Sequence, residues 1–398
     1  MRFIMASSAE IGLRTEKSED NPHGFVHVEE VPAQEVCVVY LGGDGATDDK
    51  AANGYAKIVE NEILGVIGSK VPVYSICYDF EDNKKNIARR LEFIRHRTEV
   101  LLGEKSLART TDKATEEEYA PRYINKLFDK LLAPRISQAG GKQRLPVEEA
   151  CKRIRKMTIV AHCHGGYVAF KLEKKMQEAM KKLGYSSEER KQIQSQMLVV
   201  AHAPACPLGV SKSQFVSFKS TYDLDVPQGQ NWFNYYIQKR QQEERMRFNA
   251  EENKDEAGIA ANRWFDFEPC YFAGKQGNLF LIKQKYEWDN DEGPFLINQD
   301  EHNDVHYVVV KQTNVGKMMA HFSRTILQNG IRNSLLQGEN FVPLPPLEEL
   351  ILSDNPQMNA KEKRAFLKMS ENGKAFRNKV CSFAMDKIKE IKQQERQR

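Results

Sequence analysis

The segment 156–184, KMTIVAHCHGGYVAFKLEKKMQEAMKKLG, joins a short apolar run, a turn containing two glycines and a long charged stretch. A short apolar run bounded by turn residues is typical of a buried strand, and apolar residues three and four positions apart are typical of an amphipathic helix. The glycine at position 184 favours a helix end at that point. The segment therefore predicts a strand, a tight turn and a helix that packs back against the strand.

The same alternation recurs along the chain and indicates the fold class. Four further apolar runs have the length of buried strands: EVCVVYL, VPVYSICYDF, QMLVVAHAP and SQFVSFKS. Segments with helical periodicity lie between them, as in NIARRLEFIRHRTEVLL and RYINKLFDKLLAPRI. Buried strands that alternate with amphipathic helices predict an α/β fold with a mostly parallel central sheet and helices on both faces.

A length of 398 residues accommodates one α/β domain with additions. We expect this domain over residues 36–343, with a charged and aromatic helical insertion over 229–262. The polar residues 1–35 show few periodic signals and predict an N-terminal extension. Residues 344–398 predict a helical C-terminal tail, an appendage with mostly charged side chains.

Composition narrows the classes of partner and compartment. The net charge of +4, from 59 basic and 55 acidic residues, gives no footprint of nucleic-acid binding. No apolar segment has the length of a signal peptide or a membrane span, and the seven cysteines show no repeated spacing that predicts disulfides. We therefore expect a cytoplasmic protein with reduced thiols, a composition that also suits a bacterial effector delivered into a host cell.

Cys163 lies between Ala161 and Gly165, the small-x-nucleophile-x-small pattern of a nucleophile elbow. A side chain held on a strained turn between a strand and a helix needs small neighbours two residues away on each side, because the two backbones nearly touch there. The N-terminus of the following helix would favour a thiolate and a developing oxyanion. The pattern predicts Cys163 as a nucleophile, whereas a buried structural thiol is the simpler alternative.

This strand, elbow and helix resemble those of the α/β-hydrolase superfamily, with cysteine in place of the usual serine. Thiol versions occur in dienelactone hydrolases and polyhydroxyalkanoate synthases. The resemblance implies the chain order nucleophile, acid, histidine. The acid is then Asp223 in STYDLDVP, with Asp225 as the alternative, and the base is His302 in INQDEHNDVH, with His306 as the alternative.

The resemblance also implies an oxyanion hole made of two backbone amides. One is the amide of His164, which follows the nucleophile, and the other belongs to the glycine loop after the first strand, at Gly42 or Gly43. The superfamily usually carries a His-Gly pair here, and Leu41-Gly42 replaces it, so the identity of the second donor stays open. We expect His162 and His202 to line the pocket.

Two alternatives accompany this interpretation. A metal site could use ligand-type side chains near the ends of two adjacent strands: His162, Cys163, His164, His202 and Cys206. Three consecutive ligands fit one ion poorly, and neither a CxxC nor an HExxH motif is present. The other alternative is a catalytically silent hydrolase-like module that binds a protein partner through 229–262 or the C-terminal tail.

The sequence thus predicts a hydrolase or acyltransferase with a Cys-Asp-His triad, an esterase or thioesterase in the broad sense. Its substrate would be a small molecule or an acylated compound with an ester, thioester or amide carbonyl, and no cofactor is required. An acyl-enzyme on cysteine is itself a thioester, so transfer to an acceptor is as plausible as hydrolysis.

Overall fold

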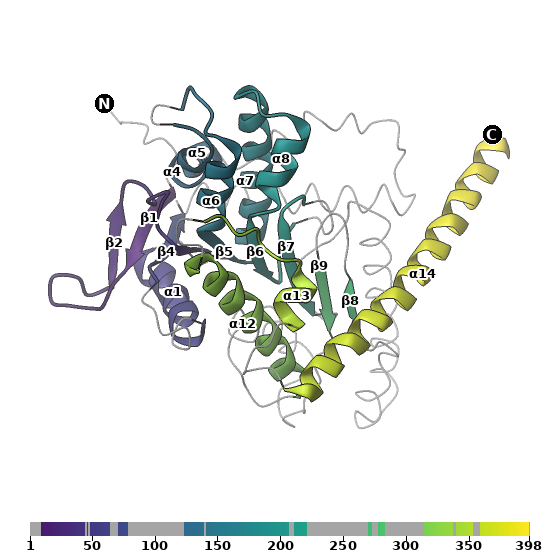
Figure 1. Cartoon of the computed structure of the whole chain (residues 1–398). Helices are drawn as coiled ribbons and strands as arrows, with labels where there is room; N and C mark the ends of the chain where they lie inside the picture. The colour runs from purple at the N-terminus through teal and green to yellow at the C-terminus, as the bar shows by residue number, and fades with distance from the viewer. Residues whose placement is uncertain are drawn as a thin grey trace, which may run out of the picture.

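The computed structural model describes most of the chain, and Figure 1 shows the arrangement of its elements. The described residues are 9–43, 46, 48–63, 71–78, 123–138, 141–206, 211–220, 270–272, 278–282, 314–336, 340–352 and 359–397. A nine-stranded sheet in the order β2-β1-β4-β3-β5-β6-β7-β9-β8 forms its centre.

The middle of the sheet is parallel, which confirms the predicted fold class at the level of a mostly parallel α/β sheet. Parallel pairs join β4, β3, β5, β6, β7 and β9 in that order, and the short β8 pairs antiparallel with β9 at one edge. The bounds are β3 Cys37–Leu41, β4 Val73–Tyr78, β5 Met157–His162, β6 Leu198–His202, β7 Gln214–Ser220, β8 Cys270–Phe272 and β9 Asn278–Ile282. Every residue of β3, β5 and β6 is buried, as expected for strands covered on both faces.

An antiparallel hairpin completes the other edge and corrects the expected N-terminal extension over 1–35. Strand β1 (Ala9–Arg14) pairs with both β2 (Phe25–Val28) and β4, and its Ile11 lies opposite Ile76. Residues 9–14 and 25–28 therefore belong to the sheet. The apolar residues of this segment are too few and too interrupted to predict strands from the sequence. The strand β4, with which β1 pairs, also lies far along the chain.

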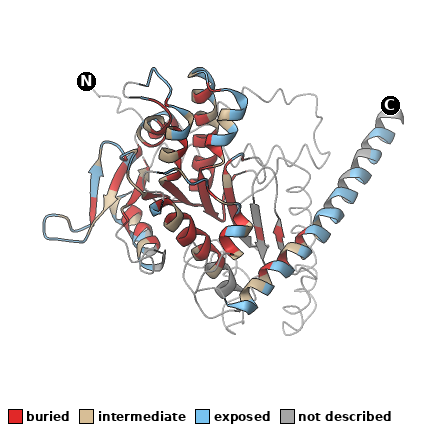
Figure 2. Cartoon of the chain, viewed as in Figure 1, coloured by how far each residue is buried: buried red, intermediate tan, exposed pale blue. Residues whose placement is uncertain are grey.

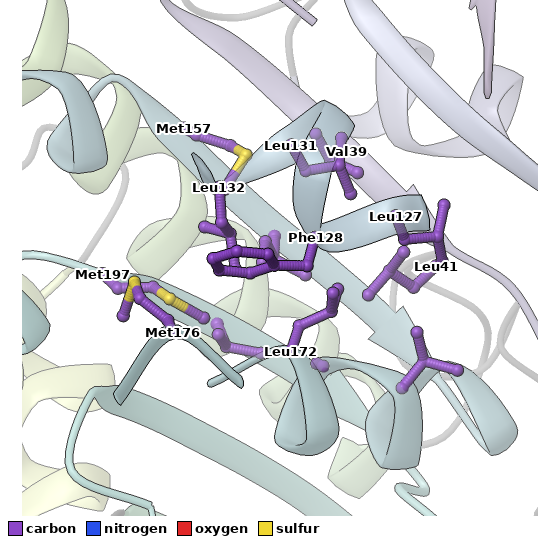
Figure 3. Close-up of a cluster of buried hydrophobic side chains, with 14 of the residues drawn as sticks. Val39, Leu41, Leu127, Phe128, Leu131, Leu132, Met157, Leu172, Met176 and Met197 are labelled. Carbon is purple, nitrogen blue, oxygen red and sulfur yellow. The ribbon is translucent and has the colours of Figure 1, made fainter. Parts of the chain in front are cut away.

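Among the described elements, five helices cover one face of the sheet and are drawn above the strands in Figure 1. Their bounds are α4 Ile124–Leu131, α5 Ala133–Ile136, α6 Val147–Arg155, α7 His164–Lys182 and α8 Ser187–Gln194. Alternate strand residues such as Val39 and Met157 pack against Phe128 of α4 and Leu172 of α7 in one buried cluster (Figure 3). The alternation of side chains along each strand is what sends these residues to a single face.

The opposite face packs against α1 (Asp49–Ile63), α12 (Asn314–Leu335) and α13 (Leu347–Leu352). The first turns of α14 (Ala360–Gln397) join this core, because Phe366 and Met369 are buried and the Phe366 ring centroid lies 4.9 Å from that of Tyr271. The tail is therefore not purely an appendage. Its earlier part covers the edge of the sheet, and the described side chains beyond residue 376 are exposed along a projecting helix (Figure 2).

The expected insertion over 229–262 lies outside the described residues. Within the part of the chain that the structure describes, no helix combines the length and the apolar character needed to cross a membrane.

Candidate active site

The order of the strands singles out the carboxyl ends of β3 and β5. From β3 the chain passes into α1 on one face of the sheet, and from β5 it passes into α7 on the other face. In open α/β sheets, ligands bind where neighbouring strands send their connections to opposite faces. The loops at Gly42-Gly43 and at Cys163, which follow these two strands, therefore form the candidate site.

Cys163 adopts an unusual backbone conformation at this point. Its φ of 46° and ψ of −113° are sterically unfavourable for a residue with a side chain. Its N–H donates to the His202 carbonyl at 3.1 Å, and its own carbonyl accepts from Gly166 at 3.0 Å and Ala205 at 2.8 Å. Three backbone hydrogen bonds thus hold the strained residue between strand β5 and the first turn of α7.

Gly165 shows why this turn needs a small residue. A Cβ at Gly165 would lie 1.9 Å from the Leu41 carbonyl oxygen and 2.8 Å from that of Gly42, so any side chain would collide with the end of β3. On the other side of the turn, Ala161 is fully buried and lies in register between Leu41 and Ala201. The small residues on both sides of Cys163 therefore let helix α7 start in contact with the strand.

Gly43 lies beside Cys163, whereas Gly42 faces elsewhere. A Cβ at Gly43 would meet the Cys163 Cβ at 3.5 Å and His162 Nδ1 at 3.0 Å, while one at Gly42 would meet Ala46 at 2.7 Å. Of the two glycines left open by the sequence, Gly43 is the one whose Cβ position faces Cys163. The same contact places His162, which is 7% exposed, at the site.

His164 is the first residue of α7, but its ring points into the protein. The ring is fully buried, and its Nε2 lies 2.6 Å from the hydroxyl of Tyr123, at the start of α4. Tyr78 and Tyr167 surround the ring at centroid distances of 5.6 Å and 6.2 Å. The backbone of His164 thus belongs to the turn, and its side chain belongs to the core on the α7 face.

His202 corrects the expectation that it lines the pocket. The residue is fully buried, and its Nε2 lies 2.7 Å from Ser323 Oγ of α12. It is therefore a hydrogen-bonded histidine inside the core on the α12 face.

The same two histidines argue against the metal alternative. The side chain of His164 packs on the α7 face of the sheet and that of His202 packs on the α12 face, so they cannot meet at one ion. Among the described residues, no group of three or more histidine, cysteine, aspartate or glutamate side chains is arranged to hold a metal.

Other buried thiols differ from Cys163 in their surroundings. Burial raises the pKa of Cys37 to about 11 and that of Cys151 to about 12. Cys37 begins β3 and Cys151 lies within α6, so neither follows the carboxyl end of a strand. Cys163, 8% exposed, contacts Ala205 in the loop after β6.

The acid and base implied by the resemblance, with their alternatives, lie outside the described residues: Asp223, Asp225, His302 and His306. The described strand ends nearest to them are those of β7 at Ser220 and β9 at Ile282. Because β5, β6, β7 and β9 are parallel neighbours, these ends lie at the same edge of the sheet as Cys163.

Two features of the site went unrecognised in the sequence. Tyr123, bonded to the ring next to Cys163, lies 41 residues before its partner, and no spacing pattern links them. Ala203, with a φ of 43°, starts the loop that carries the Ala205 amide. The repeat of Ala-His at 161–162 and 201–202 was the one available hint that the two strands end alike.

Comparison with known proteins does not identify a family for this chain. No protein-family model matches the chain. A search of curated proteins also finds no match.

Proposed function

We propose that this protein is a cysteine-dependent hydrolase or acyltransferase of the α/β-hydrolase type, with Cys163 as its nucleophile. The observation that carries the proposal is the strained backbone of Cys163, held by three hydrogen bonds where β5 turns into α7. Strain of this kind persists only when the surrounding structure enforces it, and it clusters at functional sites.

The surroundings of Cys163 support the same chemistry. The turn lies at the N-terminus of α7, where the helix dipole favours a thiolate and a developing oxyanion. Gly43 lies beside Cys163 on the loop after β3. In this superfamily the second amide of the oxyanion hole comes from the corresponding loop. We therefore propose the amides of His164 and Gly43 as the two donors.

In the proposed mechanism, His302 accepts the thiol proton while Cys163 Sγ attacks the substrate carbonyl carbon. The carbonyl oxygen becomes an oxyanion that the two amides bind. Asp223 orients the imidazole, which then gives the proton to the leaving group as the carbon–leaving-group bond breaks. The thioester on Cys163 is released by water in a hydrolase, or by an acceptor nucleophile in an acyltransferase.

Acylation by p-nitrophenyl acetate, followed by intact and peptide mass spectrometry, tests the proposal directly. We expect one acetyl group on Cys163 and release of p-nitrophenol. Cys163→Ala should remove both signals. The matched control is Cys206→Ala, because Cys206 is also buried, at 5% exposure, yet follows another strand.

Folded wild-type protein without a Cys163 adduct would contradict the proposal and leave the silent module as the better account. If the adduct forms, two variant pairs test the other roles. His302→Asn should slow acylation far more than His306→Asn, and Asp223→Asn more than Asp225→Asn. Loss of general acid–base catalysis typically costs about 10²–10⁴-fold in rate.

A further inference from the structure

A buried tyrosine–histidine pair lies directly behind the turn that carries Cys163. Tyr123 Oη and His164 Nε2 are joined by a hydrogen bond of 2.6 Å, and both residues are fully buried. A hydrogen bond this short, shielded from water, is stronger than its counterpart on the surface. It ties the start of α4 to the first residue of α7.

The rings around this pair restrict its movement further. Tyr78, at the end of β4, contacts His164 edge-on and lies 5.3 Å from the Tyr123 ring. Tyr167, one turn along α7, stacks on His164. The His164 ring is thus held from β4, α4 and α7, and the peptide N–H of the same residue lies in the turn at Cys163.

We infer that Tyr123 is a positioning residue, which fixes the His164 amide as an oxyanion donor by holding the His164 ring. The inference rests on the proposed function, since it concerns an amide used only when a carbonyl is attacked. An oxyanion donor is effective only when held about 2.7–3.1 Å from the place where the negative charge develops. Helix α7 begins at this residue, where the backbone lacks the support of a preceding helical turn.

Tyr123→Phe removes only the hydroxyl that bonds to His164. The ring remains to pack against Tyr78, and the backbone carbonyl of Tyr123 still accepts from the Leu127 amide at 2.9 Å within α4. Tyr185→Phe is the matched control. Tyr185 is equally buried on the same face, and its hydroxyl donates to the carbonyls of Ile136 and Leu145 at 2.8 Å each.

The experiment compares two reactions of Cys163. Acetylation by p-nitrophenyl acetate passes through an oxyanion, whereas alkylation by iodoacetamide does not. In Tyr123→Phe we expect acetylation to slow by about tenfold or more, a fraction of the 10²–10³-fold lost when an oxyanion donor is removed. The loss should appear in kcat with KM nearly unchanged, and alkylation should stay within about twofold of wild type. Tyr185→Phe should leave the ratio of the two rates unchanged.

The outcomes separate the inference from the proposed function. If wild type is acetylated and Tyr123→Phe keeps the wild-type ratio of acetylation to alkylation, the positioning role is overturned while the proposed function stands. Equal losses in both tyrosine variants, in both reactions, would also overturn it, because they indicate a general loss of packing. If wild type is not acetylated at all, the proposed function fails and the inference fails with it. His164→Phe, which keeps a buried ring without the hydrogen bond, should reproduce the Tyr123→Phe ratio.

Discussion

Gly165 and Leu41 approach each other so closely that a Cβ on the glycine would lie 1.9 Å from the leucine carbonyl oxygen. This contact joins the first turn of α7 to the end of β3, and it brings Cys163 next to Gly43. Backbone atoms on both sides make the contact, so a rotamer change cannot relieve a larger side chain. The position of Cys163 therefore depends on a residue that has no functional group.

Gly165→Ala should destabilise the protein strongly. Overpacking a core typically costs about 1–3 kcal/mol, and a collision with the buried backbone carbonyl at the end of β3 should exceed that range. The free energy of unfolding in urea measures the effect. Gly54→Ala is the matched control, because a Cβ there meets nothing within 4 Å in the interior of α1. It should raise stability by about 0.5–1 kcal/mol. Similar behaviour of the two variants would contradict the close contact.

Two buried arginines, Arg135 and Arg155, should differ in their response to replacement by methionine. The Arg135 guanidinium donates to the carbonyls of Ala33, Arg153, Pro32 and Leu131 at 2.7–3.1 Å. Arg135→Met leaves these buried acceptors unpaired and should lower the free energy of unfolding by about 3 kcal/mol.

For the other arginine, Arg155, the guanidinium nitrogens have no hydrogen-bond partner in the described part of the chain, and burial lowers its pKa to about 10. Arg155→Met removes an uncompensated buried charge, so stability should stay the same or rise by about 1 kcal/mol. Chemical denaturation of the two variants under identical conditions compares them. A loss in Arg155→Met as large as in Arg135→Met would show that Arg155 has a strong partner.

The central strands could be predicted from the sequence because their physics is local. A strand buried on both faces is a continuous apolar run, which is why the runs at β3, β5 and β6 were recognised. The hairpin of β1 and β2 was missed because half-buried edge strands carry a weak pattern, and β1 is stabilised by pairing with β4, more than sixty residues away.

The same distinction applies to the candidate site. Ala161, Cys163 and Gly165 express a steric demand within five residues, so the pattern was visible in the sequence. The roles of His164 and His202 depend on Tyr123 and Ser323, which are 41 and 121 residues away. Local spacing contains no information on such contacts. The sequence therefore predicts His202 in the pocket, whereas the structure places it in the core.

Stability should fall as the pH rises above about 9, because buried thiols remain protonated in the folded protein. Burial raises the pKa of Cys37 from 9.0 to about 11, an effect that the nearby Arg135 only partly offsets. Below pH 9 the thiol is protonated in both states, and its contribution to stability is fully present. Between about pH 9 and 11 the unfolded thiol loses its proton first, so stability decreases by about 1.4 kcal/mol per pH unit.

Urea unfolding at several pH values between 8 and 11 measures this slope. Cys37→Ala removes one proton that the folded protein keeps and the unfolded chain loses, so the decrease in stability per pH unit should be smaller by about 1.4 kcal/mol. Cys151→Ala should have the same effect, because burial raises the pKa of Cys151 to about 12. In the double variant, the decrease in stability per pH unit should lose the contributions of both thiols. An unchanged slope in Cys37→Ala would show that this thiol ionises alike in both states.

The buried carboxylate of Glu173 should anchor the segment that enters β7. It accepts hydrogen bonds from the Lys212 amide at 2.6 Å, the Ser213 amide at 3.2 Å, and the hydroxyls of Ser211 and Ser213. The two amides bond to Oε1 and the two hydroxyls to Oε2, and the negative charge of the carboxylate strengthens all four bonds. Glu173→Gln removes this charge and should lower the free energy of unfolding by about 2–3 kcal/mol. Glu178→Gln, on the exposed side of the same helix, should change it by less than about 0.5 kcal/mol. Hydrogen exchange at the amides of Lys212 and Ser213 should rise in Glu173→Gln alone, and equal exchange in both variants would contradict the anchor.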